Sequence, residues 1–153
     1  MELTSDMKEL IILFNEFEVE YMICGGYAVG FYGYIRATFD FDILINPNKA
    51  NAIKTMKALT KFGFGNAGFD EKSFEEEGTA IHMGVEPNAI DLLTSVSSKK
   101  TALYFKNTFT DTIENVEMKY IALDDLIEAK KLVNRNKDKI DVEELLLIKK
   151  LTK

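Results

Sequence analysis

Residues 24–46 read CGGYAVGFYGYIRATFDFDILIN, and this stretch carries the strongest indication of both fold and chemistry. Two glycines follow an apolar run, and Asp40 and Asp42 then stand one residue apart inside a second apolar run. Because alternate side chains of a β-strand lie on one face, both carboxylates are expected to point the same way. Two adjacent like charges repel and need a cation, a shared proton or full solvation. The cation that carboxylate oxygens favour together with substrate phosphates is Mg²⁺.

A third carboxylate stands in another apolar run. Asp91 is the only charged residue between positions 89 and 95, and a lone charge in a half-buried strand needs a reason. If this strand lies beside the strand of Asp40 and Asp42, the three carboxylates converge. Such a group can bind metal ions that hold a triphosphate, while one acid stays near an attacking hydroxyl. A lone aspartate such as Asp91 is more often an ordinary edge-strand residue. It becomes a candidate site residue because Asp40 and Asp42 occur in the same chain.

Length and composition indicate a single domain that spans residues 1–153. Hydrophobic residues make up 46% and charged residues 29%, and no apolar run is long enough for a transmembrane helix. The N-terminal residues lack the pattern of a secretory signal, and the single cysteine, Cys24, excludes an internal disulfide. The single histidine, His82, argues against a His-rich zinc site and is expected to be an ordinary half-buried strand residue. These features favour a cytoplasmic location with no membrane partner.

The net charge bears on the possible partners. A formal charge of −6 argues against general DNA or RNA binding, since phosphate contacts dominate such affinity. The charge is uneven, because residues 128–153 hold eight Lys or Arg and five Asp or Glu. A basic C-terminal segment beside an acidic site suits a metal-bound polyphosphate, although a solvated helix face has the same composition.

Hydrophobic periodicity and turn residues predict an α+β fold in which helices pack against a small mixed β-sheet. Asp6 and Asn46 are expected to cap the first and third helices, and Gly63 is expected to end the third. Residues 63–78 are the least regular stretch and are expected to form a long loop with a short helical piece. The expected strands are 21–24, 38–45, 79–85, 89–96, 109–113 and 116–119, and the remaining helices are expected to begin near residues 25, 98, 124 and 138.

The chain resembles the nucleotidyltransferase superfamily with the polymerase-β-like fold. The resemblance rests on Gly25 and Gly26, thirteen intervening positions, Asp40 and Asp42 in an apolar strand, and Asp91 in a later strand. A minimal bacterial branch is closer still, because it also shares Ala28, Arg36 and Thr38 ahead of the acidic pair, and Lys130, Arg135, Lys137, Asp138 and Asp141 in the tail. The likeness runs from about residue 21 to about residue 146.

This resemblance implies roles for the glycines and the acids. Gly25 and Gly26 would let the backbone approach phosphates at a helix N-terminus. Asp40 and Asp42 would hold Mg²⁺ or Mn²⁺, and Asp91 would complete the site as a metal ligand or general base.

The basic residues receive implied roles as well. Lys130 would neutralise the triphosphate, and Arg36 and Thr38 would brace the carboxylates or contact the nucleotide. The other matching tail residues are more often structural, because their spacing suits helix capping and ion pairs between helices.

The activity implied by the resemblance is Mg²⁺-dependent transfer of a nucleoside monophosphate from a nucleoside triphosphate (NTP) to a hydroxyl. The acceptor would be a protein, an RNA end or a small molecule, and stand-alone bacterial members are often toxin–antitoxin components. The alternative is a catalytically silent binding or regulatory module of the same fold. Many active members have Ser after the first glycine, whereas this chain has Gly26, which offers no hydroxyl to a phosphate.

Overall fold

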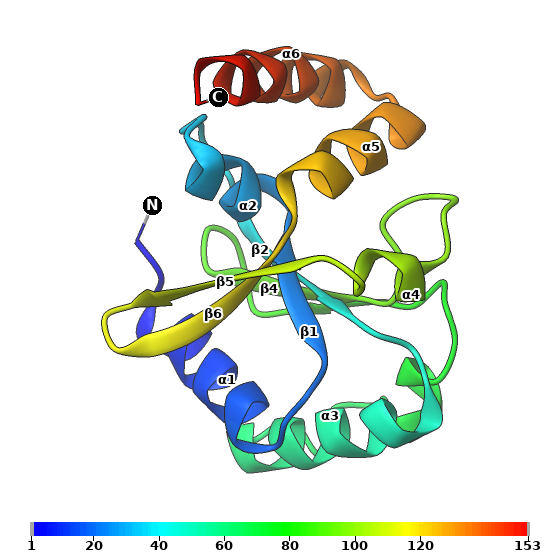
Figure 1. Cartoon of the computed structure of the whole chain (residues 1–153). Helices are drawn as coiled ribbons and strands as arrows, with labels where there is room; N and C mark the ends of the chain where they lie inside the picture. The colour runs from blue at the N-terminus through cyan, green and yellow to red at the C-terminus, as the bar shows by residue number, and fades with distance from the viewer. Residues whose placement is uncertain (1, 153) are drawn as a thin grey trace.

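The computed structural model describes residues 2–152 and has the predicted α+β fold. Six strands form one mixed sheet in the order β3-β4-β2-β1-β6-β5 (Figure 1). The strands are β1 (Tyr21–Cys24), β2 (Asp40–Ile45), β3 (Ala80–Met83), β4 (Ala89–Leu93), β5 (Thr108–Ile113) and β6 (Val116–Ile121). The helices are α1 (Ser5–Glu16), α2 (Gly25–Tyr32), α3 (Lys49–Phe62), α4 (Thr101–Tyr104), α5 (Leu123–Val133) and α6 (Asn136–Leu151), with one 3₁₀ turn, η1 (Glu71–Phe74).

The two central strands, β1 and β2, are almost entirely apolar. All four residues of β1 are buried, and in β2 only Asp40 and Asp42 are partly exposed. The two strands pair antiparallel, whereas β2 pairs parallel with β4 on its other side. The β2–β4 pairing matters most for function, because it fixes how the acids of the two strands face each other.

Helices cover the sheet from two sides (Figure 1). α1 and α3 pack against each other on one side, and α2, α5 and α6 gather on the other. The core between these layers includes the fully buried rings of Phe14, Tyr21 and Phe41. Within residues 2–152, no helix has both the length and the apolar character that a membrane span requires.

Two predicted helix caps are wrong. α1 begins earlier than expected, because the Thr4 hydroxyl accepts a hydrogen bond from the Met7 amide at 3.2 Å. α3 is capped by Asn48, whose side chain accepts from the Asn51 amide at 2.8 Å. In both helices a side-chain oxygen accepts from a free N–H group of the first turn. The residue that does so stands two positions from the predicted cap: Thr4 instead of Asp6, and Asn48 instead of Asn46. The predicted stop of α3 at Gly63 is confirmed.

Several elements are shorter than their patterns predicted. β2 begins at Asp40 rather than at residue 38, and the helix expected to begin near residue 98 is the single turn α4, which begins at Thr101. β4 ends at Leu93, although the Thr94 amide still donates to the Thr79 carbonyl at 3.0 Å. The Thr94 carbonyl accepts from the Thr101 hydroxyl at 2.5 Å, and such a side-chain hydrogen bond competes with strand pairing beyond this residue.

Candidate functional site

The three acids singled out by the sequence lie on neighbouring strands. Asp40 and Asp42 alternate along β2, and Asp91 of β4 stands opposite Asp42 in the parallel register. Side chains at paired positions of a sheet lie on the same face, so the three carboxylates converge. They line one cleft of about 390 Å³ together with Lys130, on the side of the sheet that α5 covers.

The surroundings of Asp42 disfavour the charged form of its carboxyl group. Burial comes first among the causes, followed by repulsion from Asp91 and Asp40, and together they raise the pKa of Asp42 to about 7. A hydrogen bond shared with Asp91 adds to this effect, whereas the charge of Lys137 opposes it. A group of this kind can bind a proton or a cation, and both relieve the same repulsion.

Asp40 has an unsatisfied acceptor. Its Oδ1 atom is buried and has no hydrogen-bond partner among residues 2–152. A buried carboxylate oxygen without a donor is costly and calls for an ion or water. Oxygen donors from converging carboxylates are the ligands that divalent cations such as Mg²⁺ and Mn²⁺ use, so the residues present fit such an ion.

Gly25 is required where the backbone passes Asp42. Its φ is +65°, and a Cβ at this position would overlap the Asp42 carboxylate. Only glycine combines this backbone conformation with so close an approach. The first turn of α2 therefore begins directly against the acidic cluster, as the glycine pair predicted.

Gly26 has a packing role that sequence reasoning missed. A Cβ here would lie 2.5 Å from Thr38 Oγ1 and 2.7 Å from Thr38 Cβ. Thr38 thus occupies the space that any other residue at position 26 would fill, and its hydroxyl also donates to the Asp40 carbonyl at 3.4 Å. Thr38 braces the start of β2 against α2 through the backbone, and its expected contact with the carboxylates or the nucleotide stays a prediction.

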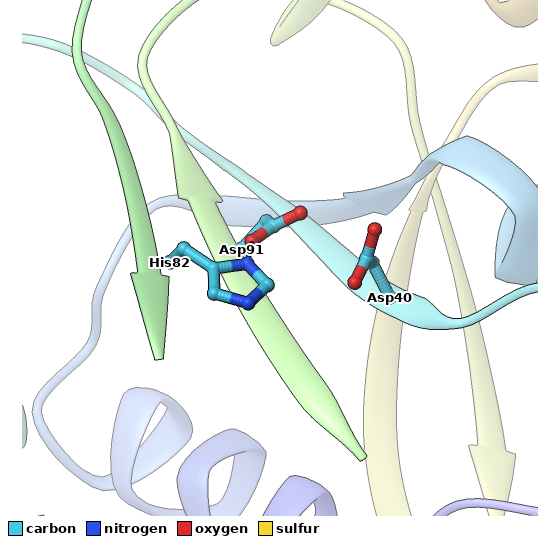
Figure 2. A group of neighbouring side chains, drawn as sticks. All are labelled: Asp40, His82 and Asp91. Atoms are coloured by element: carbon cyan, nitrogen blue, oxygen red, sulfur yellow. Dashed lines mark hydrogen bonds and ion pairs between the residues drawn. The ribbon is translucent and has the colours of Figure 1, made fainter. Parts of the chain in front are cut away.

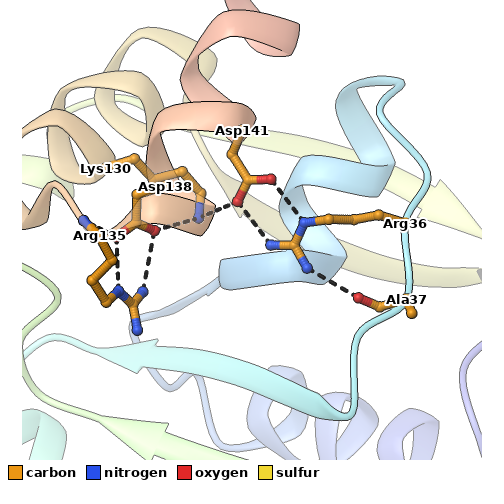
Figure 3. A network of polar contacts seen from close by, with 6 residues as sticks. All are labelled: Arg36, Ala37, Lys130, Arg135, Asp138 and Asp141. Atoms are coloured by element: carbon orange, nitrogen blue, oxygen red, sulfur yellow. Dashed lines mark hydrogen bonds and ion pairs between the residues drawn. The ribbon is translucent and has the colours of Figure 1, made fainter.

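Arg36 forms a two-point ion pair with the buried Asp141. Its Nε and Nη2 atoms donate to the two carboxylate oxygens of Asp141, both at 2.8 Å, and Nη1 donates to the Ala37 carbonyl at 3.1 Å (Figure 3). Such a two-point contact fixes both position and orientation. The pair joins the segment before β2 to α6, so Arg36 braces the site through Asp141 rather than through the three acids.

Lys130 is a buried lysine that pairs with two acids of α6. It is 7% exposed, and its Nζ lies 2.9 Å from Asp141 and 3.4 Å from Asp138. Asp138 is also held by Arg135, whose Nε donates at 2.7 Å. Burial alone would raise the pKa of Asp138, but the hydrogen bonds from Arg135 and the charge of Lys130 outweigh it and lower that pKa.

The ion-pair network of Figure 3 consists of Arg36, Lys130, Arg135, Asp138 and Asp141. Three cations face two fully buried acids, so the network carries a net charge of +1. Its cations line a second cleft of about 260 Å³, which also holds Asp40, Asp42 and the glycine turn. An acidic cluster and a cationic wall thus share one opening, an arrangement that can accept a metal-bound polyphosphate.

His82 is the functional candidate that sequence reasoning passed over. It pairs across β3 and β4 with Asp91, and its Nδ1 lies 2.5 Å from Asp91 Oδ1 (Figure 2). Its side chain is 54% exposed, so the prediction of an ordinary half-buried strand residue is wrong. The hydrogen bond to Asp91 raises the pKa of the imidazole.

Comparisons with known proteins identify the fold. The sequence matches no protein-family model and no curated protein. In structure the chain is similar to an antigenic nucleotidyltransferase-like protein from Paracoccidioides brasiliensis, with a TM-score of 0.54 and 15% identity. The similarity covers 97% of this chain and 78% of that chain. The protein therefore has a nucleotidyltransferase-like fold.

Proposed function

We propose that the protein is a nucleotidyltransferase that moves a nucleoside monophosphate from an NTP to a hydroxyl acceptor. The observation that carries this proposal is the convergence of Asp40, Asp42 and Asp91 beside the first turn of α2. The fold shared with a nucleotidyltransferase-like protein supports it.

Asp40, Asp42 and Asp91 would hold Mg²⁺ or Mn²⁺, which supplies charge neutralisation to the triphosphate when it is bound. The backbone at Gly25 would let the phosphates approach the N-terminus of α2, where free N–H groups favour anions. The net positive network around Lys130 would stabilise the charge that builds up on the departing pyrophosphate.

The acceptor hydroxyl would attack the α-phosphorus while the bond to the bridging oxygen of pyrophosphate breaks. The hydroxyl proton would pass to Asp91, whose carboxylate faces the cleft from β4. Lys130 would act at the opposite end of the reaction, because it approaches the cleft from α5. The attacking and departing groups would then meet different sides of the cleft.

The direct test is label transfer from each α-³²P-labelled NTP, with Mg²⁺ or Mn²⁺, to proteins, RNA and small molecules of a cell lysate. We expect a labelled product with the wild-type chain and none with the Asp40→Asn/Asp42→Asn variant. A label pattern that is the same for both proteins would contradict the proposal. The chemical nature of the labelled product identifies the acceptor.

A second candidate is a nucleotide-binding module without turnover. The observation that favours it is the absence of a hydroxyl at Gly26, whose side-chain space is occupied by Thr38. This candidate predicts metal-dependent NTP binding, measured by calorimetry, without label transfer to any acceptor.

The resemblance to stand-alone bacterial members extends the proposal to a toxin–antitoxin role. Induced expression in a bacterial host tests it, with growth as the measurement and the Asp40→Asn/Asp42→Asn variant as the inert control. Growth arrest by the wild type alone supports a toxin that acts through this site, and unimpaired growth with both proteins counts against one.

A further inference from the structure

The acids of the cleft do not form one symmetrical group. A ligand atom from each of Asp40, His82 and Asp91 lies within 4.8 Å of the other two, which is the spacing of donors around one metal ion (Figure 2). This cluster, here called the histidine triplet, includes a nitrogen donor and leaves out Asp42. Asp42 instead lies against Gly25, at the glycine turn.

The position of His82 suits a ligand better than a packing residue. It projects from β3, the edge strand of the sheet, and more than half of its side chain is exposed. The register between β3 and β4 sets it opposite Asp91, so the imidazole reaches the Asp91 carboxylate from the exposed edge of the sheet. The buried and unpartnered Asp40 Oδ1 lies on the other side of the same space, as Figure 2 shows for the two side chains.

We propose that the histidine triplet is a binding site for a divalent transition-metal ion, with His82 as its nitrogen ligand, and that this site prefers Mn²⁺ to Mg²⁺. Mg²⁺ is bound almost exclusively by oxygen, whereas imidazole suits transition metals of the first row. Two carboxylates and one imidazole leave further coordination positions open for water or phosphate oxygens. The inference rests on the proposed function only for the use of the ion in catalysis, because binding itself needs no nucleotide.

The single histidine of the chain makes the test specific. Mn²⁺ added to the protein without an affinity tag can be followed by electron paramagnetic resonance, which counts free Mn²⁺ and, in pulsed form, detects a coordinated nitrogen. We expect an imidazole ¹⁴N signal in the wild type. Labelling histidine with ¹⁵N must change that signal to the ¹⁵N pattern, and this control needs no substitution at all.

The matched variants are His82→Gln and Glu86→Gln. His82→Gln should remove the nitrogen signal, weaken Mn²⁺ binding about 10-fold and change Mg²⁺ binding less than about 2-fold, because only the softer ion loses a preferred ligand. Glu86 is a nearby acid outside the triplet, so Glu86→Gln should weaken both ions alike and keep the nitrogen signal. Circular dichroism before the titration verifies that each variant is folded.

Each outcome bears on one proposal. A wild-type protein that binds Mn²⁺ without a nitrogen signal overturns the assignment of His82, as does an equal loss of Mn²⁺ and Mg²⁺ affinity in His82→Gln. Neither result affects the proposed transferase activity, which label transfer tests separately. A nitrogen signal in a protein that transfers no label would keep the metal site and reject the activity.

Discussion

The Asp42 carboxylate links the stability of the protein to pH. Its pKa rises from 3.8 to about 7 on folding, through burial and the charges of Asp91 and Asp40. Between these two values the folded chain holds a proton that the unfolded chain has lost, so the free energy of unfolding falls as pH rises. The stabilising contribution is complete below about pH 4 and is lost as pH rises through about 7.

We expect Asp42→Asn to be more stable than the wild type at pH 8 by about 1–2 kcal/mol, a value reduced to allow for charge coupling within the cluster. The difference should shrink as pH falls toward 4, where folded Asp42 holds its proton and the unfolded carboxyl is about half protonated. Urea unfolding at pH 4, 6 and 8 measures it. Asp138 and Asp141 have lowered pKa values and also make stability depend on pH. Both residues are present in the wild type and in Asp42→Asn, so their contributions cancel in the difference between the two proteins. A stability gap that does not vary with pH would contradict this account.

Lys130 is a buried member of the ion-pair network. Two fully buried acids, Asp138 and Asp141, share its charge. Lys130→Ala leaves each buried acid with a single arginine partner, Arg135 or Arg36, and removes its contact with Lys130, so the variant should destabilise the protein by about 2 kcal/mol. Lys131→Ala is the control, because Lys131 is exposed on the same helix and should cost less than about 0.5 kcal/mol. Thermal unfolding that changes equally in the two variants would mean that the network adds little.

His82 shows why the position of a single residue is harder to predict when it depends on the pairing of two strands. Periodicity correctly predicted that Asp40 and Asp42 share a face, because that relation is local to one strand. The position of His82 depends on the register of the β3–β4 hairpin, in which residue 82 pairs with residue 91. The predicted strands 79–85 and 89–96 leave a gap centred on residue 87, which would pair residue 82 with residue 92, one position from the observed partner. A register error of one position places the paired side chain on the other face.

The glycine turn and the segment before β2 form one packed unit. Gly26 leaves the space that Thr38 fills, so a side chain at position 26 must displace Thr38. We expect Gly26→Ala to cost about 1–3 kcal/mol through overpacking. Thr38→Gly removes both clashing atoms, so the double variant Gly26→Ala/Thr38→Gly should be less destabilised than the sum of the two single variants.

Chemical denaturation of the four proteins of this cycle measures the coupling. Costs that simply add would show that the two residues do not share the space. Nucleotide affinity of the same variants separates packing from phosphate contact, since a packing role predicts that the double variant also regains NTP binding.

Much of the fold could be predicted from sequence, because apolar periodicity and glycine positions act locally. The strand β1, the start of α2 and the end of α3 agree with their patterns. The contact between Arg36 and Asp141 could not be predicted from spacing, since it joins residues 105 positions apart and depends on how α6 packs. Side-chain partners across such distances follow from tertiary packing, which a single sequence does not reveal.

The cleft as a unit must balance the charge of its ligand. An NTP brings about four negative charges to a site that already holds three carboxylates, so metal ions and basic side chains are both needed. We expect NTP with Mg²⁺ to raise the melting temperature of the wild type by linkage. The Asp40→Asn/Asp42→Asn variant should show no such gain, and equal gains in the two proteins would contradict the metal site.

Lys137 is the basic residue that best tests this balance. It lines both clefts, is exposed at the start of α6, and its charge lowers the pKa of Asp42. A substitution of Lys130 would also remove its ion pairs with Asp138 and Asp141, so it would change the fold and nucleotide binding together. We expect Lys137→Ala to weaken binding of NTP with Mg²⁺ by about 1–2 kcal/mol, as for a charge-assisted contact. The melting temperature without ligand should stay the same, because an exposed lysine adds little to stability. Lys139→Ala is the matched control on the same helix and outside both clefts, and equal losses in the two variants would indicate general attraction rather than a contact by Lys137.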